Sequence, residues 1–230
     1  EPLLAEWETE KAAIAANRQL VVIVPVGPLD YGYWAAELNR RQLDGSALVT
    51  INMDEYLDGG GNWIAEEHPL SFRRFMRESL FARLSGVSSI PPENRIFPDP
   101  QHPERVPDIL ARHGGADICY AGIGLSGHLA FNDPRREDEP CDDNAVRRSP
   151  TRALDLLETT RSQICLCGTD GIWDLVPRRA VTVAGSIGPT TRSLLLTGGA
   201  TFAEMRAAFR EQALGLIEGG CDYLLVETAS

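Results

Sequence analysis

Two short polar segments hold side chains that could move protons. Asp54 lies within the segment Asn-Met-Asp-Glu-Tyr, residues 52–56, and His128 lies within a glycine-rich segment, residues 122–134. A carboxylate can take a proton from a carbon next to a carbonyl group, and an imidazole can exchange protons with oxygen near neutral pH. Alone, Asp54 is more typical of a turn or helix cap, and His128 of a structural histidine. Together they favour sugar-ring opening followed by aldose–ketose isomerisation.

Apolar runs that alternate with helical patterns predict the elements that would bring these segments together. Strands are predicted at residues 20–24, 47–51, 116–121, 180–183, 193–197 and 221–226, and helices at 33–42, 69–84, 106–113 and 201–216. The proline-rich residues 90–100 are predicted to be a connection. Strands separated by helices are typical of an α/β domain with a mostly parallel sheet covered on both faces. Ligands of such sheets bind beyond the carboxyl ends of the strands, where both polar segments fall.

Composition excludes several classes of partner. The 230 residues include 33 acidic and 22 basic side chains, a net charge of −11, which argues against nucleic acid and against anionic membranes. No apolar run reaches the roughly 18 residues of a membrane span, and the N-terminus lacks a signal-peptide pattern. Cys119, Cys165 and Cys167 lie in apolar runs that resemble strands, so we expect buried, reduced thiols and a cytoplasmic protein.

Other sites that the sequence could suggest are less consistent with it. Residues 122–127 fit G-x-G-x-x-G, but Asn132-Asp133-Pro134 breaks the chain before a dinucleotide-binding helix can form, so no cofactor is predicted. His, Cys, Asp and Glu residues do not stand at metal-ligand spacing, so no metal is predicted. The charged residues 135–152 are interpreted as a solvated loop, with a lid over the site, at about 135–175, as the alternative.

At three ordered motifs the chain resembles the glucosamine-6-phosphate isomerase/deaminase family. The motifs are Asn52–Leu57, Glu67–Met76 and Gly122–Pro134, and the resemblance is predicted to run from about Leu20 to the C-terminus. It implies a single Rossmann-like three-layer α/β sandwich over residues 1–230. It also implies an enzyme that opens an amino-sugar phosphate, isomerises it through an enediol and releases ammonia from C2.

The resemblance also assigns roles to individual residues. Asp54 matches the base that moves the C2 proton, His128 matches the ring-opening histidine, and Asp133 stands where the family has Glu. The predicted substrate-binding residues are Gly27, Glu55, Tyr56, Gly124, Ser126, Gly127 and Arg161.

Several positions depart from the family pattern. Ser126 replaces a family Asp, which weakens the carboxylate–histidine relay. The loop at residues 26–30 contains a proline and Asp30 where the family cradles phosphate, and residues 197–201 lack the family lysine. The sugar is therefore predicted to differ from glucosamine 6-phosphate, to bind its phosphate elsewhere, or not to react.

Three functions remain open from the sequence. The first is a divergent amino-sugar isomerase/deaminase acting on a small sugar or sugar phosphate, with a homo-oligomer left open. The second is a hydrolase of the 6-phosphogluconolactonase type, against which Tyr56 and the run Ala-Phe-Asn-Asp-Pro argue. The third is a non-catalytic sugar sensor, which Ser126 and the altered phosphate loop keep open.

Overall fold

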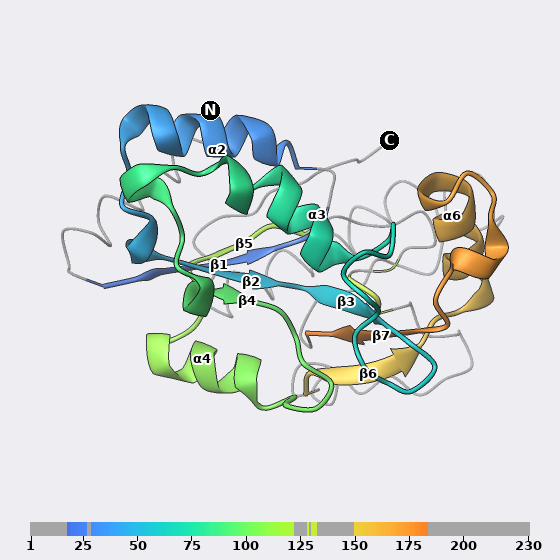
Figure 1. Cartoon of the computed structure of the whole chain (residues 1–230). Coiled ribbons are helices and arrows are strands. Elements are labelled where there is room, and N and C mark those ends of the chain that lie inside the picture. Colours follow the sequence, from blue (N-terminus) through green and yellow to red (C-terminus); the bar gives the residue numbers. More distant parts are fainter. Residues whose placement is uncertain (1–17, 27–28, 122–127, 129, 133–149, 184–230) are drawn as a thin grey trace, which may run out of the picture.

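A computed structural model describes residues 18–26, 29–121, 128, 130–132 and 150–183. Two sheets organise these residues (Figure 1). The first is a four-stranded sheet in the order β4-β2-β1-β5, and every pairing in it is parallel. The second is a three-stranded antiparallel sheet in the order β3-β7-β6. The strands are β1 Leu20–Val24, β2 Leu48–Asn52, β3 Asp54–Leu57, β4 Arg95–Ile96, β5 Ile118–Cys119, β6 Arg152–Asp155 and β7 Arg179–Thr182.

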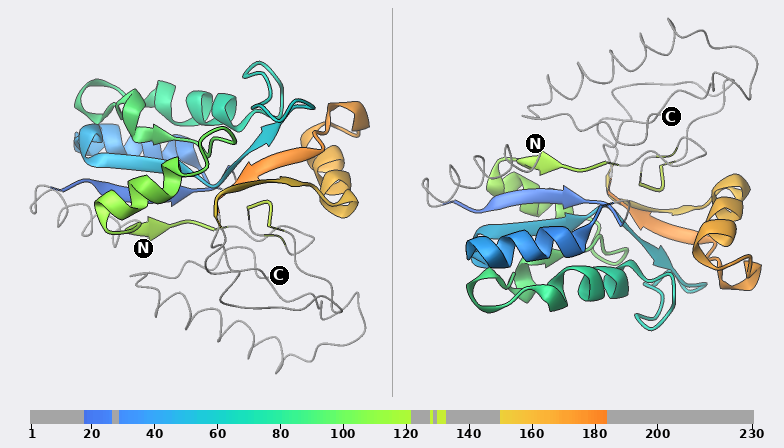
Figure 2. Two further views of the ribbon diagram at one scale, coloured as in Figure 1. Left: turned by 90° about the horizontal axis from the view of Figure 1, so that it is seen from below. Right: turned by 90° about the horizontal axis from the view of Figure 1, so that it is seen from above.

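Helices cover both faces of the parallel sheet. These helices are α2 Tyr31–Arg41, α3 Phe72–Ser79 and α4 Arg105–His113. A further helix, α6 Glu158–Gly168, packs against the antiparallel sheet. Side chains of α2 and α3 pack with Leu20, Val22 and Leu48 in one core cluster, and side chains of α4 pack with Val21 and Ile51 in another. Alternating strand residues therefore enter different layers. Figure 2 shows the sheet and its helices from two opposite sides. The predicted three-layer α/β arrangement with a parallel central sheet is confirmed.

A third core cluster lies on one face of the antiparallel sheet. In it, Tyr56 of β3, Leu154 of β6 and Ala180 of β7 pack with Ile164 of α6 and with Phe131. Among the described residues, no helix is long and apolar enough to cross a membrane.

Several predicted elements match the structure and others do not. The strand at residues 20–24 is confirmed, the helix at 33–42 begins two residues earlier, and the helix at 69–84 shortens to α3 followed by a 3-10 turn, Phe81–Arg83. The strand-like interpretation of Cys165 and Cys167 is wrong, because both lie in α6, and Cys119 and Cys167 are exposed. The strands at 193–197 and 221–226 and the helix at 201–216 lie outside the described residues.

Three short strands escaped prediction. β4 lies inside the proline-rich connection, β3 follows β2 after one residue, and β6 borders the charged segment. The described part of the predicted lid, residues 150–175, contains β6, α6 and a 3-10 turn, Trp173–Leu175. Because β6 pairs with β7 along its whole length, this part is built into the second sheet.

Candidate active site

Asp54 begins β3 at the point where the chain leaves the parallel sheet. The Met53 N–H donates to Val24 O of β1 (3.1 Å), and Met53 O accepts from Val183 N (2.7 Å), so one residue joins both sheets. The Asp54 side chain is buried, and among the described residues no hydrogen bond reaches its carboxyl group. Burial, and secondarily the nearby charge of Glu55, raises the pKa of Asp54 to about 8. A carboxyl group that titrates near neutrality is suited to accept and return a proton.

Glu55 has a different environment. Its carboxylate is fully buried and accepts hydrogen bonds from the backbone N–H groups of Tyr56 (2.8 Å), Phe72 (3.1 Å) and Arg73 (3.0 Å). It also accepts from Ser71 Oγ (3.4 Å) and forms an ion pair with Arg73 Nε (3.1 Å). Glu55 therefore satisfies the first N–H groups of α3 and anchors β3 to that helix. These contacts occupy the side chain that the sequence assigned to substrate.

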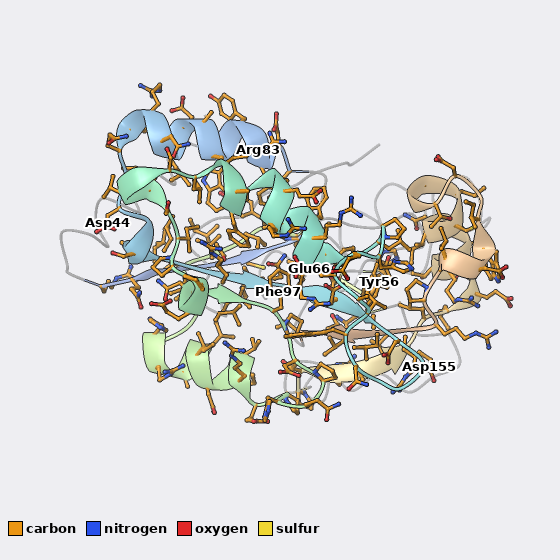
Figure 3. The ribbon with its side chains drawn as sticks, in the orientation of Figure 1. Asp44, Tyr56, Glu66, Arg83, Phe97 and Asp155 are labelled. Carbon is orange, nitrogen blue, oxygen red and sulfur yellow. The ribbon has the colours of Figure 1, made fainter. Side chains whose placement is uncertain are left out.

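Tyr56 lies in an aromatic cluster that reaches the segment of His128. Its ring centroid is 4.8 Å from that of Phe72 and 4.9 Å from that of Phe131, and Figure 3 shows Tyr56 between α3 and the antiparallel strands. The ring of His128 lies 6.3 Å from Phe131. Burial, and then the charges of Asp54 and Glu55, raises the Tyr56 pKa well above its usual value, so the phenol stays neutral. The cluster packs the His128 segment against β3.

Asp54 shares a sheet face with this cluster. Strand register places Asp54 opposite Thr182 and Thr182 opposite Arg152, one row beyond Tyr56, Ala180 and Leu154. Side chains two positions apart on a strand point to the same face. Asp54 and the aromatic cluster therefore belong to one face of the antiparallel sheet.

Asn132 lies over the row that contains Asp54. Its Nδ2 donates to Thr182 Oγ1 (3.4 Å), and its Oδ1 accepts from the Arg152 guanidinium (2.7 Å). Together with Phe131, Asn132 fixes the chain that carries His128 over the face that carries Asp54. The structure thus brings the segments of the two predicted acid–base residues to one face.

Arg161, the predicted lid arginine, is engaged within its own part of the fold. It lies on α6, where Nε donates to Pro177 O (3.3 Å) and the guanidinium covers the Trp173 ring at 4.5 Å. Asp30 caps α2 by accepting from Tyr33 N (3.0 Å), so a carboxylate already occupies that helix terminus. The other predicted site residues, Gly27, Gly124, Ser126, Gly127 and Asp133, lie outside the described residues.

Sequence reasoning missed the residues that hold the site together. Phe131, Asn132, Thr182 and Arg152 connect the His128 segment to the second sheet. The run Ala-Phe-Asn-Asp-Pro was a signal for the first two. Arg152 and Thr182 carried no local signal, because their importance comes from the pairing of β6 with β7. Among the described residues, no group of His, Cys, Asp and Glu is placed to hold a metal.

Comparison with known proteins gives the same result as the motifs. Glucosamine-6-phosphate deaminase of Bacillus cereus (strain G9842) is 32% identical over 170 residues, which is 74% of this chain and 58% of that protein. The enzyme of that name from Bacillus thuringiensis (strain Al Hakam) is 31% identical over 187 residues, 81% of this chain and 64% of that protein. The chain is a divergent relative of glucosamine-6-phosphate deaminases.

One solved structure shares the fold of this deaminase relative. A monomeric glucosamine-6-phosphate deaminase superposes with a TM-score of 0.56 at 22% identity, over 72% of this chain and 64% of the other. The chain spans less than two thirds of the length of these deaminases. The covered share is 64% of the Bacillus thuringiensis protein and 53% of a glucosamine-6-phosphate deaminase from Exiguobacterium sp. (strain ATCC BAA-1283 / AT1b).

A second similarity covers the C-terminal part. A family model described as Homocysteine S-methyltransferase matches residues 135–230, less than half of the chain. The alignments with the two Bacillus deaminases cover 170 and 187 residues.

Proposed function

We propose that this deaminase relative catalyses aldose–ketose isomerisation of an amino-sugar phosphate, with release of ammonia from C2. His128 protonates the ring oxygen as the sugar ring opens. Asp54, in its ionised form, then removes the proton from C2 and returns it to C1, which leaves an imine at C2. Water adds to that carbon, ammonia leaves, and the ketose forms. Asp133 assists His128, and the glycine-rich residues 122–127 approach the ligand with their backbone.

One observation carries the proposal. Asp54 is a buried carboxyl group whose pKa is raised to about 8, and it lies on the sheet face over which Phe131 and Asn132 hold the His128 segment. A structural carboxylate would be paired, as Glu55 is. A buried acid that has no partner among the described residues, next to a segment with an imidazole, supports proton transfer.

Phosphate recognition is proposed to differ from the family pattern. Asp30 occupies the N-terminus of α2, which argues against an anion there. The segment at residues 197–201, which lacks the family lysine, falls within the part that matches the methyltransferase model. We propose that this segment is not the counterpart of the deaminase phosphate loop, so its missing lysine does not count against deamination.

Two further proposals concern the class of ligand and the cellular compartment. We propose a small-molecule sugar phosphate as the ligand and the cytoplasm as the compartment. Cys165 and Cys167, which form no disulfide bond in the described part of the chain, fit a reducing environment.

The proposal is tested by incubating the protein with glucosamine 6-phosphate, other phosphorylated and free amino sugars, and 6-phosphogluconolactone. Ammonia and ketose formation are measured. We expect both products from an amino-sugar phosphate, and a loss of about 10²- to 10⁴-fold in turnover for Asp54→Asn. The matched control is Asp155→Asn, whose side chain on β6 is 88% exposed and which should keep full turnover.

The alternatives give different results. Hydrolysis of the lactone without ammonia formation would identify the hydrolase. Binding of a sugar phosphate without turnover would identify the sensor. Turnover that survives in Asp54→Asn would remove Asp54 as the base.

A further inference from the structure

Asn52, the last residue of β2, is buried, and its amide has no partner among the described residues. Its exposed fraction is 0%, and in that part of the chain neither Oδ1 nor Nδ2 has a hydrogen-bond partner. Within the described part of the chain, the only other buried side-chain atom of this kind is Oε1 of Gln163. Folded proteins pair nearly all buried polar groups, since an unpaired donor or acceptor loses its hydration without compensation. A residue with both amide atoms unpaired therefore requires an explanation.

The position of Asn52 points to a ligand. Asn52 pairs with Val24 at the carboxyl ends of β2 and β1. The next residue, Met53, bonds to both sheets, so Asn52 stands where the parallel and antiparallel sheets part, two residues before Asp54. Ligands of open α/β sheets bind at such carboxyl ends, where neighbouring chains diverge. Asn52 thus lies at the end of the strand that leads directly to Asp54.

We propose that Asn52 binds a hydroxyl group of the sugar substrate through both amide atoms. A hydroxyl group is a donor and an acceptor at one oxygen, so it can satisfy Oδ1 and one N–H of Nδ2 together or through adjacent hydroxyls. A phosphate dianion can only accept and would leave Oδ1 unpaired. The chemical class that fits is a polyol. This inference rests on the proposed function and adds a residue that selects and orients the substrate beside Asp54.

Asn94 offers a matched comparison at the opposite end of β2. Its Nδ2 donates to Ser46 O (3.2 Å) and to Leu48 O (2.9 Å), so its amide has a structural role in the free protein. Leucine has nearly the shape of asparagine but no hydrogen-bonding groups. Replacing each asparagine by leucine therefore separates a ligand-binding amide from a structural one.

The experiment measures glucosamine 6-phosphate binding by calorimetry and the midpoint of thermal unfolding without ligand. For Asn52→Leu we expect affinity to fall by about 10- to 100-fold and the unfolding midpoint to stay or rise, because no hydrogen bond of the free protein is lost. For Asn94→Leu we expect the reverse, a lower midpoint with unchanged affinity. Asn52→Ala carries the same binding test with a smaller side chain if leucine does not fit.

Deoxy derivatives of glucosamine 6-phosphate supply a readout that a structural role would not move. One derivative, lacking the hydroxyl that Asn52 binds, should lose about 10-fold in affinity for the wild type and nothing further for Asn52→Leu. Equal affinity of wild type and Asn52→Leu would overturn the inference and leave the proposed function standing. A lower midpoint for Asn52→Leu and Asn52→Ala alike would overturn it by showing that the amide is paired in the free protein. Failure of the wild type to bind any sugar phosphate would remove the proposed function and the inference together.

Discussion

The two sheets of this molecule differ in the charge that they bury. Among the described residues, the buried carboxyl groups lie in the antiparallel sheet, whereas the parallel sheet buries the uncharged Thr50 and Asn52 of β2. The parallel sheet carries apolar residues into both helical layers, so that Val21 and Ile51 meet α4 while Val22 and Leu48 meet α2 and α3. The antiparallel sheet is smaller but buries Asp54, Glu55 and Thr182 along with its aromatic cluster. Burial of charge costs stability unless it is compensated. The parallel sheet therefore supplies the stability on which the costly polar groups of the second sheet depend.

The difference is sharpest between two adjacent residues of β3. Glu55 has a full set of donors, including the N-terminus of α3 and Arg73. Asp54 has none among the described residues, and its pKa rises to about 8. One carboxylate holds the strand in place, and the neighbouring one is left with a proton that it can exchange. The three predictions below test this division, beginning with the largest expected effect.

The stability of Asp54→Asn relative to the wild type should depend on pH. Because the folded-state pKa of Asp54 lies above its ordinary value of 3.8, its stabilising contribution is present at low pH and is lost as the pH rises to about 8. The advantage of Asn should grow between about pH 4 and pH 8, by at most about 1.4 kcal/mol for each pH unit. Urea unfolding at a series of pH values measures it. A pH-independent difference would show that Asp54 is ionised or paired in the folded protein.

Removal of the Glu55 carboxylate should destabilise the protein strongly. Glu55→Ala leaves the Arg73 guanidinium and the first N–H groups of α3 without their acceptor, and breaking a buried pair from one side costs about 3–5 kcal/mol. Denaturant unfolding measures the loss. The control is Glu78→Ala, which removes an exposed pair with Arg74 on α3 and should cost less than about 1 kcal/mol. Equal effects of the two substitutions would mean that Glu55 does not anchor β3.

A strand or helix could be predicted from the sequence where its own residue pattern identifies it, and not where distant pairing or packing forms it. β1 was predicted to the residue because five consecutive apolar side chains, Leu20–Val24, identify a buried parallel strand locally. β3 was missed because Asp-Glu-Tyr-Leu has no apolar alternation, and it is a strand only because β7 pairs with it. α6 was missed because it buries only Thr160 and Cys165 and has no side-chain cap.

The candidate site divides in the same way. Asp54 and His128 were found from residue type and motif, and the structure brings their segments to one face through Phe131 and Asn132. Glu55 was assigned to substrate by its place in the motif, but its contacts with Arg73 and α3 depend on tertiary structure that no local pattern contains. Residue type predicts which groups can react, whereas packing decides which of them remain available.

The parallel sheet should affect stability without affecting chemistry. Leu48, at the amino end of β2, is buried in the core cluster with Leu20 and α2, away from the carboxyl end where Asn52 and Asp54 lie. Leu48→Ala should lower the free energy of unfolding by about 2–5 kcal/mol, because it removes buried methyl groups and leaves a cavity.

Turnover per folded molecule should remain unchanged in Leu48→Ala, measured under conditions where the variant is fully folded. The volume-conserving control, Leu48→Met, should cost less than about 1.5 kcal/mol. If Leu48→Ala instead lowered turnover as strongly as it lowered stability, the two ends of the parallel sheet would be mechanically coupled. The division of labour between the sheets would then be wrong, because the stabilising layer would also position the proton-transfer groups.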